Sequence, residues 1–318
     1  MCGIVGAVTE RRVRNILLEG LKRLEYRGYD SAGLATLEPD NEILSNRQIG
    51  KVANLVAEVG NLDLNGTIGI AHTRWATHGS VQVENTHPHM SGDNLALVHN
   101  GIIENNQLLK AQLQEIGYQF LSDTDSEVIV HLIDSQLKEG ASLVEAVRKG
   151  VKRLDGAYAI AVISADFPNR IVAARSGCPL VIGRGIGENF VASDVMALQA
   201  VTDRFIFLEE GDLVELTTDA IDIWNVENSS VIRADIKVEM GTDDLDKGRF
   251  RHFMEKEIFA QPEVLKESIG ARLGKDKVLE QAFGIESKQI FDHVDAITIA
   301  ACGTSFYAAS VARYWIED

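Results

Sequence analysis

The sequence predicts an α+β protein in which antiparallel sheets stack on each other and helices cover their outer faces. Short Val- and Ile-rich segments typical of strands open the chain, amphipathic helices follow, and a second run of short strands comes at hairpin spacing. Strands grouped before and after the helices, instead of alternating with them, favour antiparallel sheets over a parallel doubly wound sheet.

The first hundred residues supply strands and one helix of this fold. Residues 2–9 (CGIVGAVT) are typical of a buried strand, and residues 13–24 carry apolar side chains at helical spacing. Residues 73–93 form an irregular stretch rich in His, Asn, Gly and Thr. Further strands are predicted at 32–37, 42–49, 67–72 and 95–99, and the last ends in a predicted turn at Asn100-Gly101.

The middle of the chain supplies helices and then the second run of strands. Apolar spacing predicts helices at 105–116, 126–138 and 142–153. Strands bounded by turn residues are predicted at 158–164, 170–174, 180–183, 190–192, 204–208 and 212–216.

The last third of the chain has a different organisation. Residues 240–250 are polar and rich in Gly and Asp, as in a linker, and 251–273 are mostly helical. An apolar strand at 296–301 meets the turn 302–305 and then a helix at 306–316, which is the opening of a βαβ unit. Because one strand and one helix cannot form a parallel sheet, we expect this second domain to be cut short.

Composition and charge exclude several classes of protein. Lys and Arg number 31 against 47 Asp and Glu, and the net charge of −16 argues against binding DNA or RNA through phosphates. Apolar runs stay shorter than the roughly 18 residues of a membrane span, and the N-terminus does not follow the signal-peptide pattern, so we expect a cytoplasmic protein with no membrane partner. Cys2, Cys178 and Cys302 are too widely spaced for a disulfide framework or a structural zinc site.

Cys2 is a candidate nucleophile because it directly follows the initiator methionine. Aminopeptidases remove Met1 efficiently before a small residue, which would place a thiol and an α-amine on one residue. An α-amine has an ordinary pKa of about 7.7–8.0, so it could take the thiol proton near neutral pH. Gly3 would let the backbone approach a ligand closely. A small buried residue of the first strand is the alternative reading of Cys2.

The loop after the strand at 67–72 carries side chains that could recognise an amino acid. Arg74 could hold an α-carboxylate through two parallel hydrogen bonds. Thr77 and the backbone at His78 could add donors, and Trp75 could act as a wall or gate. The alternative is a surface loop anchored by the indole.

Asn100 and Gly101 offer a side-chain amide beside a backbone N–H. Two adjacent donors are what an oxyanion hole for amide hydrolysis needs, and each is worth about 2.7–4 kcal/mol of transition-state stabilisation. Asn-Gly is also the commonest hairpin turn, so a purely structural role stays open.

Acidic and histidine-rich segments complete the candidate residues. Residues 122–127 (SDTDSE) precede a helix, where Thr124 or Asp125 could cap it while one carboxylate pairs a substrate ammonium. His87 and His89 form a His-x-His pair, but a third ligand at metal spacing is not evident, so a structural role is favoured over a metal site.

Taken together, these motifs resemble the class II glutamine amidotransferases with an N-terminal nucleophile. The motifs are specific because they appear in order across essentially the whole chain, from MCGIVG, LEYRGYDSAG and GIAHTRWATHG to NTHPH and HNGIIEN. The resemblance implies a four-layer αββα sandwich of two antiparallel sheets. It also implies domains at 2–239 (catalytic core to about 218), at 240–285 (linker and interdomain helices) and at 286–318 (start of a sugar isomerase domain).

The resemblance implies a role for each matching residue. Cys2 is the nucleophile, Asn100 and Gly101 form the oxyanion hole, and no metal or organic cofactor is needed. Asp123 stands where relatives often have Glu, whereas the key Asp125 is retained. Glutamine would be bound or enclosed by Arg27, Arg74, Trp75, Thr77, His78, His87 and Asp125.

The C-terminal motifs imply a sugar phosphate as the second substrate. Cys302-Gly303-Thr304-Ser305 resembles the start of a sugar isomerase domain, where Thr304 and Ser305 would bind the phosphate at a helix N-terminus. Longer relatives would pass ammonia to fructose 6-phosphate and form homodimers through their isomerase domains. In this chain we expect that sugar site to be incomplete.

Two other functions remain open from the sequence. The same N-terminal chemistry could serve a phosphoribosyl or aspartyl acceptor, although the segments 251–258 and 302–305 speak against both. The chain could also be an inactive glutamine- or sugar-phosphate-sensing module, which retention of Met1 would support.

Overall fold

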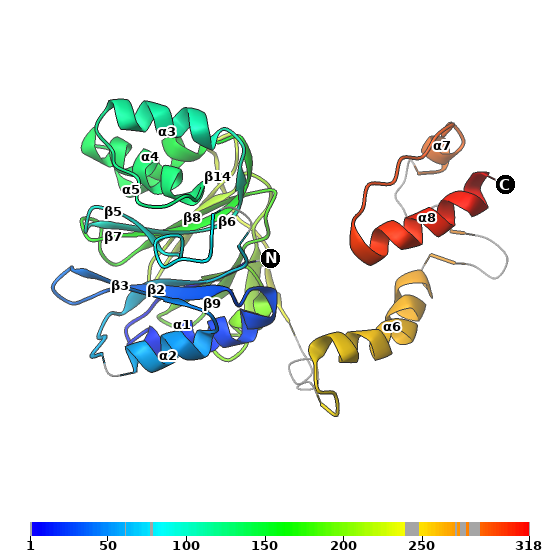
Figure 1. Ribbon diagram of the computed structural model, residues 1–318, viewed down its shortest axis with the longest axis horizontal. Helices are drawn as coiled ribbons and strands as arrows, with labels where there is room; N and C mark the ends of the chain where they lie inside the picture. The colour runs from blue at the N-terminus through cyan, green and yellow to red at the C-terminus, as the bar shows by residue number, and fades with distance from the viewer. Residues whose placement is uncertain are drawn as a thin grey trace. The chain divides into compact units, whose positions relative to one another are not determined.

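The computed structural model describes residues 2–60, 62–76, 79–238, 248–270, 272–273, 278–279 and 287–317. The chain divides into two compact units, Met1–Met240 and Gly241–Asp318. In the first unit two antiparallel sheets lie face to face, with helices beyond each of them (Figure 1). This arrangement confirms the predicted α+β class and the stacking of antiparallel sheets.

The first sheet is built around β1, which lies between β10 and β4 and pairs antiparallel with both. A strand in that position has neighbours on both sides, so its backbone is fixed along its whole length. In spatial order the described strands of this sheet are β15 (Asp235–Lys237), β11 (Arg204–Phe207), β9 (Val181–Arg184), β10 (Asn189–Ala192), β1 (Gly3–Val8), β4 (Ile68–Arg74), β2 (Ser31–Leu37) and β3 (Ile43–Ile49).

The second sheet is also antiparallel, and its two longest strands, β6 and β7, are paired over nine residues. In spatial order its described strands are β14 (Ser230–Val231), β13 (Ile221–Trp224), β12 (Leu213–Leu216), β8 (Ile171–Ser176), β7 (Gly156–Ser164), β6 (Leu95–Ile103) and β5 (His89–Ser91).

Helices cover the outer face of each sheet (Figure 1). On α1 (Arg14–Leu24) the buried side chains Leu17, Leu21 and Leu24 pack with the outer face of the first sheet. The same sheet is covered by α2 (Val52–Val59). The second sheet is covered by α4 (Ser126–Lys138) and α5 (Leu143–Val151), with α3 (Asn106–Glu115) beside α4. Two short 3-10 turns are η1 (Glu25–Arg27) and η2 (Val195–Ala197).

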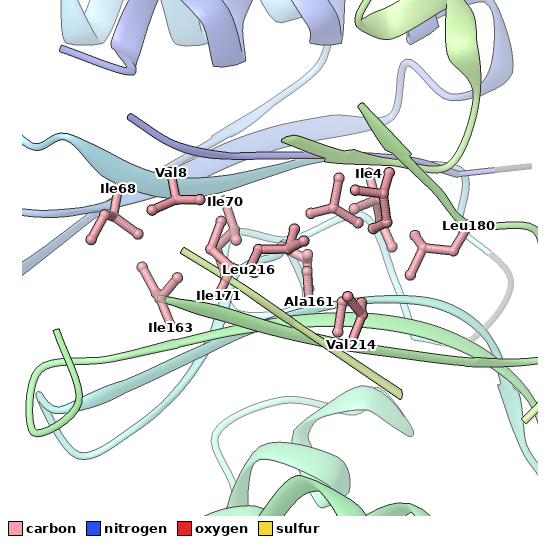
Figure 2. Packing of buried hydrophobic residues seen from close by; sticks show 14 of the residues in the cluster. Ile4, Val8, Ile68, Ile70, Ala161, Ile163, Ile171, Leu180, Val214 and Leu216 are labelled. Carbon is pink, nitrogen blue, oxygen red and sulfur yellow. The ribbon is translucent and has the colours of Figure 1, made fainter. Parts of the chain in front are cut away.

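The main core lies between the two sheets, and alternation along each strand decides which residues enter it. On β1, Ile4 and Val8 point into this core, whereas Val5 and Ala7 point to the helix side. Figure 2 shows Ile4, Val8 and their neighbours from the first sheet facing side chains of the second. Because both faces of these strands are covered, their sequences are continuous apolar runs and do not alternate between apolar and polar residues.

The predicted Asn-Gly turn is wrong. Strand β6 continues through both residues to Ile103, where Asn100 pairs with Ala159 and Gly101 with Tyr158. The long-range partner β7 supplies ladder hydrogen bonds here, so a local hairpin is not formed. Gly101 has φ +138°, and a Cβ atom there would lie 1.9 Å from the carbonyl oxygen of Ala157. Glycine is therefore required by the strand itself.

Several elements differ from the sequence prediction. The short segments α2, β5, β13, β14 and β15 were not predicted, because each is too brief for a periodic pattern to stand out. The predicted strand at 296–301 is not formed, and Ile297 and Ile299 are at least half exposed. Among the described residues of that unit there is no strand to pair with it, so its backbone groups have no ladder to join.

In the second unit, α6 (Phe253–Gly270) and α8 (Gly303–Glu317) match the predicted helices. The short helix α7 (Ser287–Phe291) was not predicted. Thr304 and Ser305 lie exposed in the first turn of α8, which buries no residue. Across the described residues of both units, no helix combines the length and the apolar character that crossing a bilayer requires.

The inter-sheet core can be tested with two isoleucines that lie close together in sequence. Ile182 is fully buried in the core, whereas Ile186, in the loop after β9, is fully exposed. We expect Ile182→Ala to lower the free energy of unfolding by about 2–5 kcal/mol and Ile186→Ala to change it by less than about 0.5 kcal/mol. Urea denaturation followed by circular dichroism measures both, and equal effects of the two variants would contradict the described core.

Candidate active site

The thiol of Cys2 is held by the backbone of Trp75. The antiparallel register of β1 and β4 pairs Gly3 with Thr73, which brings the residue before β1 beside the residues that follow β4. The Trp75 N–H donates to Cys2 Sγ at 3.2 Å, and Sγ lies 3.6 Å from the Trp75 carbonyl oxygen. Two backbone contacts therefore fix the sulfur at the edge of the sandwich.

The reactivity of this thiol depends on its surroundings. Burial raises the pKa of the Cys2 thiol, and the Trp75 N–H and the Arg74 guanidinium only partly offset that effect. The sulfur is therefore protonated at neutral pH unless a base takes its proton.

Four side chains near the sulfur share one structural origin. Cys2 precedes β1, His72 and Arg74 lie on β4, and Asn100 lies on β6. Each follows the alternation that sends Ile4, Ile68, Ile70, Ala96 and Val98 into the inter-sheet core. The site is thus the end of that core at which apolar side chains give way to polar ones.

Arg74 is almost completely buried at the end of β4. Its guanidinium donates to the carbonyl oxygens of Ser80, at 3.2 Å, and Gly79, at 3.4 Å. These contacts tie the loop after β4 to the guanidinium, which also borders a pocket lined by Cys2, Gly101 and Asp125. A buried guanidinium beside a small pocket can pair a carboxylate with strong, directional hydrogen bonds.

Asn100 and Gly101 lie on the opposite sheet from Cys2. The Asn100 amide Nδ2 donates to the Cys2 backbone carbonyl at 3.2 Å, so this side chain bridges the two sheets next to the sulfur. Gly101 lines the same pocket, and its backbone leaves no room for a side chain. The Asn100 amide and the Gly101 backbone therefore both lie next to Cys2.

Asp125 lies at the start of α4 with its carboxylate buried. Its Oδ2 accepts a hydrogen bond from the Ile103 N–H at 2.7 Å, and Oδ1 accepts a longer one from the Ser126 hydroxyl at 3.5 Å. The same hydroxyl lies 2.8 Å from His99 Nδ1. The carboxylate thus belongs to a residue that lines the same pocket as Cys2, where it can pair a cation.

Histidines form a buried layer next to this pocket. The rings of His72 and His87 lie 4.1 Å apart, and those of His87 and His89 lie 4.5 Å apart. Burial lowers the pKa of His72 and of His89 to about 3, and it also lowers the pKa values of His87 and His99. These rings are therefore neutral. Among the described residues no group of His, Cys, Asp and Glu is arranged to hold a metal ion.

Cys2 also lines a second, more apolar cleft of about 430 Å³. Trp75 borders it with an indole that is 43% exposed and stands edge-on to Tyr29. Arg27 also lines it and is held by an ion pair with Asp194 and a 2.9 Å hydrogen bond to the Tyr26 hydroxyl. Cys2 thus lines both a polar pocket and an apolar cleft.

The structure brings most of the sequence-predicted residues to one place. Cys2, Arg74, Trp75, His87, Gly101 and Asp125 line the polar pocket, and Arg27 and Asn100 line the adjoining cleft. Thr77 and His78 lie outside the described residues. Thr304 and Ser305 belong to the second unit.

Sequence reasoning missed His72 and His99. Both are buried, and both contact a predicted site residue or the residue next to one. The signal that could have found His72 is strand alternation, because it stands two residues before Arg74 on the same face of β4.

Comparisons with known proteins place this site in a functional context. The model of a glutamine amidotransferase domain matches residues 72–200 of this chain. Over its full length the chain is 55% identical to a glutamine–fructose-6-phosphate aminotransferase (isomerizing) of Pseudomonas putida and 51% identical to that of Haemophilus influenzae. The chain spans about half the length of these curated relatives, 52% in each case.

Solved structures show the same fold at lower identity. The glutamine phosphoribosylpyrophosphate amidotransferase of B. subtilis, complexed with ADP and GMP, is similar with a TM-score of 0.62 and 25% identity. An allosteric regulatory enzyme of purine biosynthesis is similar with the same TM-score and 27% identity. Each comparison covers 71% of this chain and 49% of the other.

The neutral histidines make stability depend on pH. The folded-state pKa of His72, about 3, lies below its ordinary value of 6.5, so between these values the unfolded chain binds a proton that the folded chain does not. Stability therefore falls as pH falls through this window. We expect His72→Gln to reduce the slope of the free energy of unfolding against pH by up to about 1.4 kcal/mol per pH unit between pH 6 and pH 4. Urea titrations at several pH values measure the slope, and an unchanged slope would show that His72 is protonated in the folded chain.

Proposed function

Because a glutamine amidotransferase domain model matches residues 72–200 and the whole chain is similar to glutamine–fructose-6-phosphate aminotransferases, we propose that it hydrolyses the side-chain amide of glutamine at Cys2. The observation that carries the proposal is the small pocket that Cys2 shares with Arg74, Gly101 and Asp125. A nucleophile, an oxyanion donor, a cation for the substrate carboxylate and an anion for its ammonium are the groups that this reaction requires.

The proposed reaction begins after removal of Met1, when Cys2 carries a free α-amine. That amine takes the thiol proton, and Sγ forms a bond to the side-chain amide carbon of glutamine. The carbonyl electron pair moves to oxygen, where the Asn100 side chain and the Gly101 N–H stabilise it. The carbon–nitrogen bond then breaks, and the nitrogen takes the proton from the amine and leaves as ammonia.

Water completes the cycle by attacking the γ-glutamyl thioester. The water gives a proton to the α-amine as its oxygen bonds to the acyl carbon. The carbon–sulfur bond breaks, the thiolate recovers a proton, and glutamate leaves. No step requires a metal or an organic cofactor, since the amine serves as base and then as acid.

Glutamine would be oriented by the two charged side chains of the pocket. Arg74 would pair its α-carboxylate, and Asp125, held by the Ile103 N–H, would pair its α-ammonium. Thr77 and His78 would complete the pocket, and His87 would form part of its wall. Trp75 and Arg27 would order and cover the side of the site that opens to the apolar cleft.

The acceptor of the ammonia belongs to the longer protein that the relatives represent. We infer that it is fructose 6-phosphate and that glucosamine 6-phosphate is formed, as the first step of amino-sugar synthesis in the cytoplasm. Thr304 and Ser305 would contribute to the phosphate site, and the complete protein would be a homodimer through its isomerase domains. Phosphoribosyl and aspartyl acceptors are not favoured, because relatives with the fructose 6-phosphate name are 50–55% identical whereas the phosphoribosylpyrophosphate enzyme is 25% identical.

The nucleophile can be tested by removing its sulfur. We expect Cys2→Ala to abolish release of glutamate from glutamine, since the acyl group then has no atom to bind. Cys302→Ala, which removes an exposed thiol in the second unit, should leave glutaminase activity unchanged. Glutamate formation and intact mass are measured on the same samples. Wild-type activity in Cys2→Ala, or full activity of a protein that retains Met1, would refute the N-terminal mechanism.

The ammonium site can be tested with two neighbouring aspartates. Asp125→Asn removes the charge but keeps an oxygen for the Ile103 N–H, so we expect KM for glutamine to rise about 10–100-fold, as for loss of a charged hydrogen bond. Asp123→Asn changes an exposed carboxylate that contacts Asn85 and should alter KM by less than about threefold. Steady-state kinetics distinguish them, and an unchanged KM in Asp125→Asn would exclude this carboxylate as the ammonium partner.

A further inference from the structure

His72 makes the contact that decides how the Asn100 amide is oriented. It lies on β4 and is buried to 1% exposure. Its Nε2 lies 3.0 Å from the carbonyl oxygen of His99 and 3.0 Å from Asn100 Oδ1. One ring nitrogen of the first sheet therefore faces two consecutive residues of the second sheet.

The backbone carbonyl in this contact determines the tautomer of the ring. A carbonyl oxygen only accepts hydrogen bonds, so Nε2 must carry a hydrogen to bond to His99. The same N–H then requires an acceptor on Asn100, and the amide oxygen is the acceptor. The amide nitrogen is thereby turned to the other side, where it donates to the Cys2 carbonyl at 3.2 Å.

The surroundings of His72 keep the ring in this state. Burial lowers its pKa to about 3, so the ring stays neutral and Nδ1 carries no hydrogen. Nδ1 is buried, without a hydrogen-bond partner among the described residues. The His87 ring packs at 4.1 Å and restricts the ring plane. A reversed Asn100 amide would set its N–H₂ group against the Nε2–H and leave two donors facing each other.

We propose that His72 is a positioning residue that holds the Asn100 amide with its nitrogen toward Cys2, ready to stabilise the oxyanion. The inference rests on the proposed glutaminase function, because Asn100 matters as a donor only if an oxyanion forms at Cys2. His72 itself touches neither the sulfur nor the substrate in this assignment. Its effect is carried entirely through the direction of the Asn100 amide.

Two amide variants of His72 provide a matched test. The amide nitrogen of glutamine reaches the position of Nε2, whereas that of asparagine reaches only the position of Nδ1. We expect His72→Gln to keep glutaminase kcat within about threefold of wild type. His72→Asn should lower kcat about tenfold or more, up to the 10²–10³-fold expected for losing one oxyanion donor, with KM changed by less than about threefold.

A double-variant cycle separates positioning from a general structural role. If His72 acts through Asn100, His72→Asn should have no further effect on kcat in an Asn100→Ala background. His131→Asn removes another buried histidine, one that bonds to Ser91 instead of Asn100, and should leave kcat within about threefold. The inference would be overturned if the effects of His72→Asn and Asn100→Ala on kcat were fully additive in free energy. It would also be overturned if His72→Asn kept wild-type kcat while Asn100→Ala lost most of it.

A measurement on the unaltered protein keeps the inference testable if a variant fails to fold. Histidine ring ¹⁵N chemical shifts report which nitrogen carries the hydrogen, and we expect the Nε2–H tautomer for His72 at pH 7. The Nδ1–H tautomer would overturn the inference. Loss of activity in Cys2→Ala with wild-type activity in Asn100→Ala would also overturn it, whereas full activity in Cys2→Ala would refute the proposed function itself.

Discussion

The pairing of β1 with β4 is the constraint on which the rest of the site depends. It sets Gly3 opposite Thr73, so the residue before β1 meets the backbone that follows β4. A Cβ atom at Gly3 would lie 2.7 Å from the Thr73 hydroxyl and 2.8 Å from Leu24, so the close approach needs glycine. β10 pairs with the other edge of β1, so β1 is held on both sides. A shift of β1 by one residue against these neighbours would move each of its side chains to the opposite face.

A polar site inside a sandwich carries an energetic cost that its hydrogen bonds offset. Glu127 is almost completely buried, and its carboxylate accepts from the N–H groups of Leu121 and Ser122 and from the Ser122 hydroxyl. These donors and His131 lower the pKa of Glu127 to about 2 against the opposing effect of burial. The loop before α4 is therefore fixed by a charge that does not face the pocket. Asp125, two residues earlier, is left to line it.

Features that depend on residues nearby in the sequence could be predicted, whereas features that depend on contacts between distant residues could not. The two-sheet fold, α4 and most strands could be predicted, because local apolar patterns mark them. The path of β6 through Asn100 and Gly101 could not, because it depends on β7, some sixty residues away. Cys2, Arg74 and Asp125 stood out by chemistry and position. His72 did not, because its significance arises from a contact across the two sheets to a residue 28 positions later in the chain.

The backbone of Trp75 has one further consequence for how the site can move. The same residue presents its N–H to Cys2 Sγ and its indole to the apolar cleft. A motion that displaces the Trp75 backbone would remove its N–H donor from the sulfur and would also move one wall of the cleft. Rotation of the indole about its own bonds opens the cleft and leaves the sulfur untouched. A backbone displacement of Trp75 therefore affects both the sulfur and the cleft, whereas a side-chain rotation affects only the cleft.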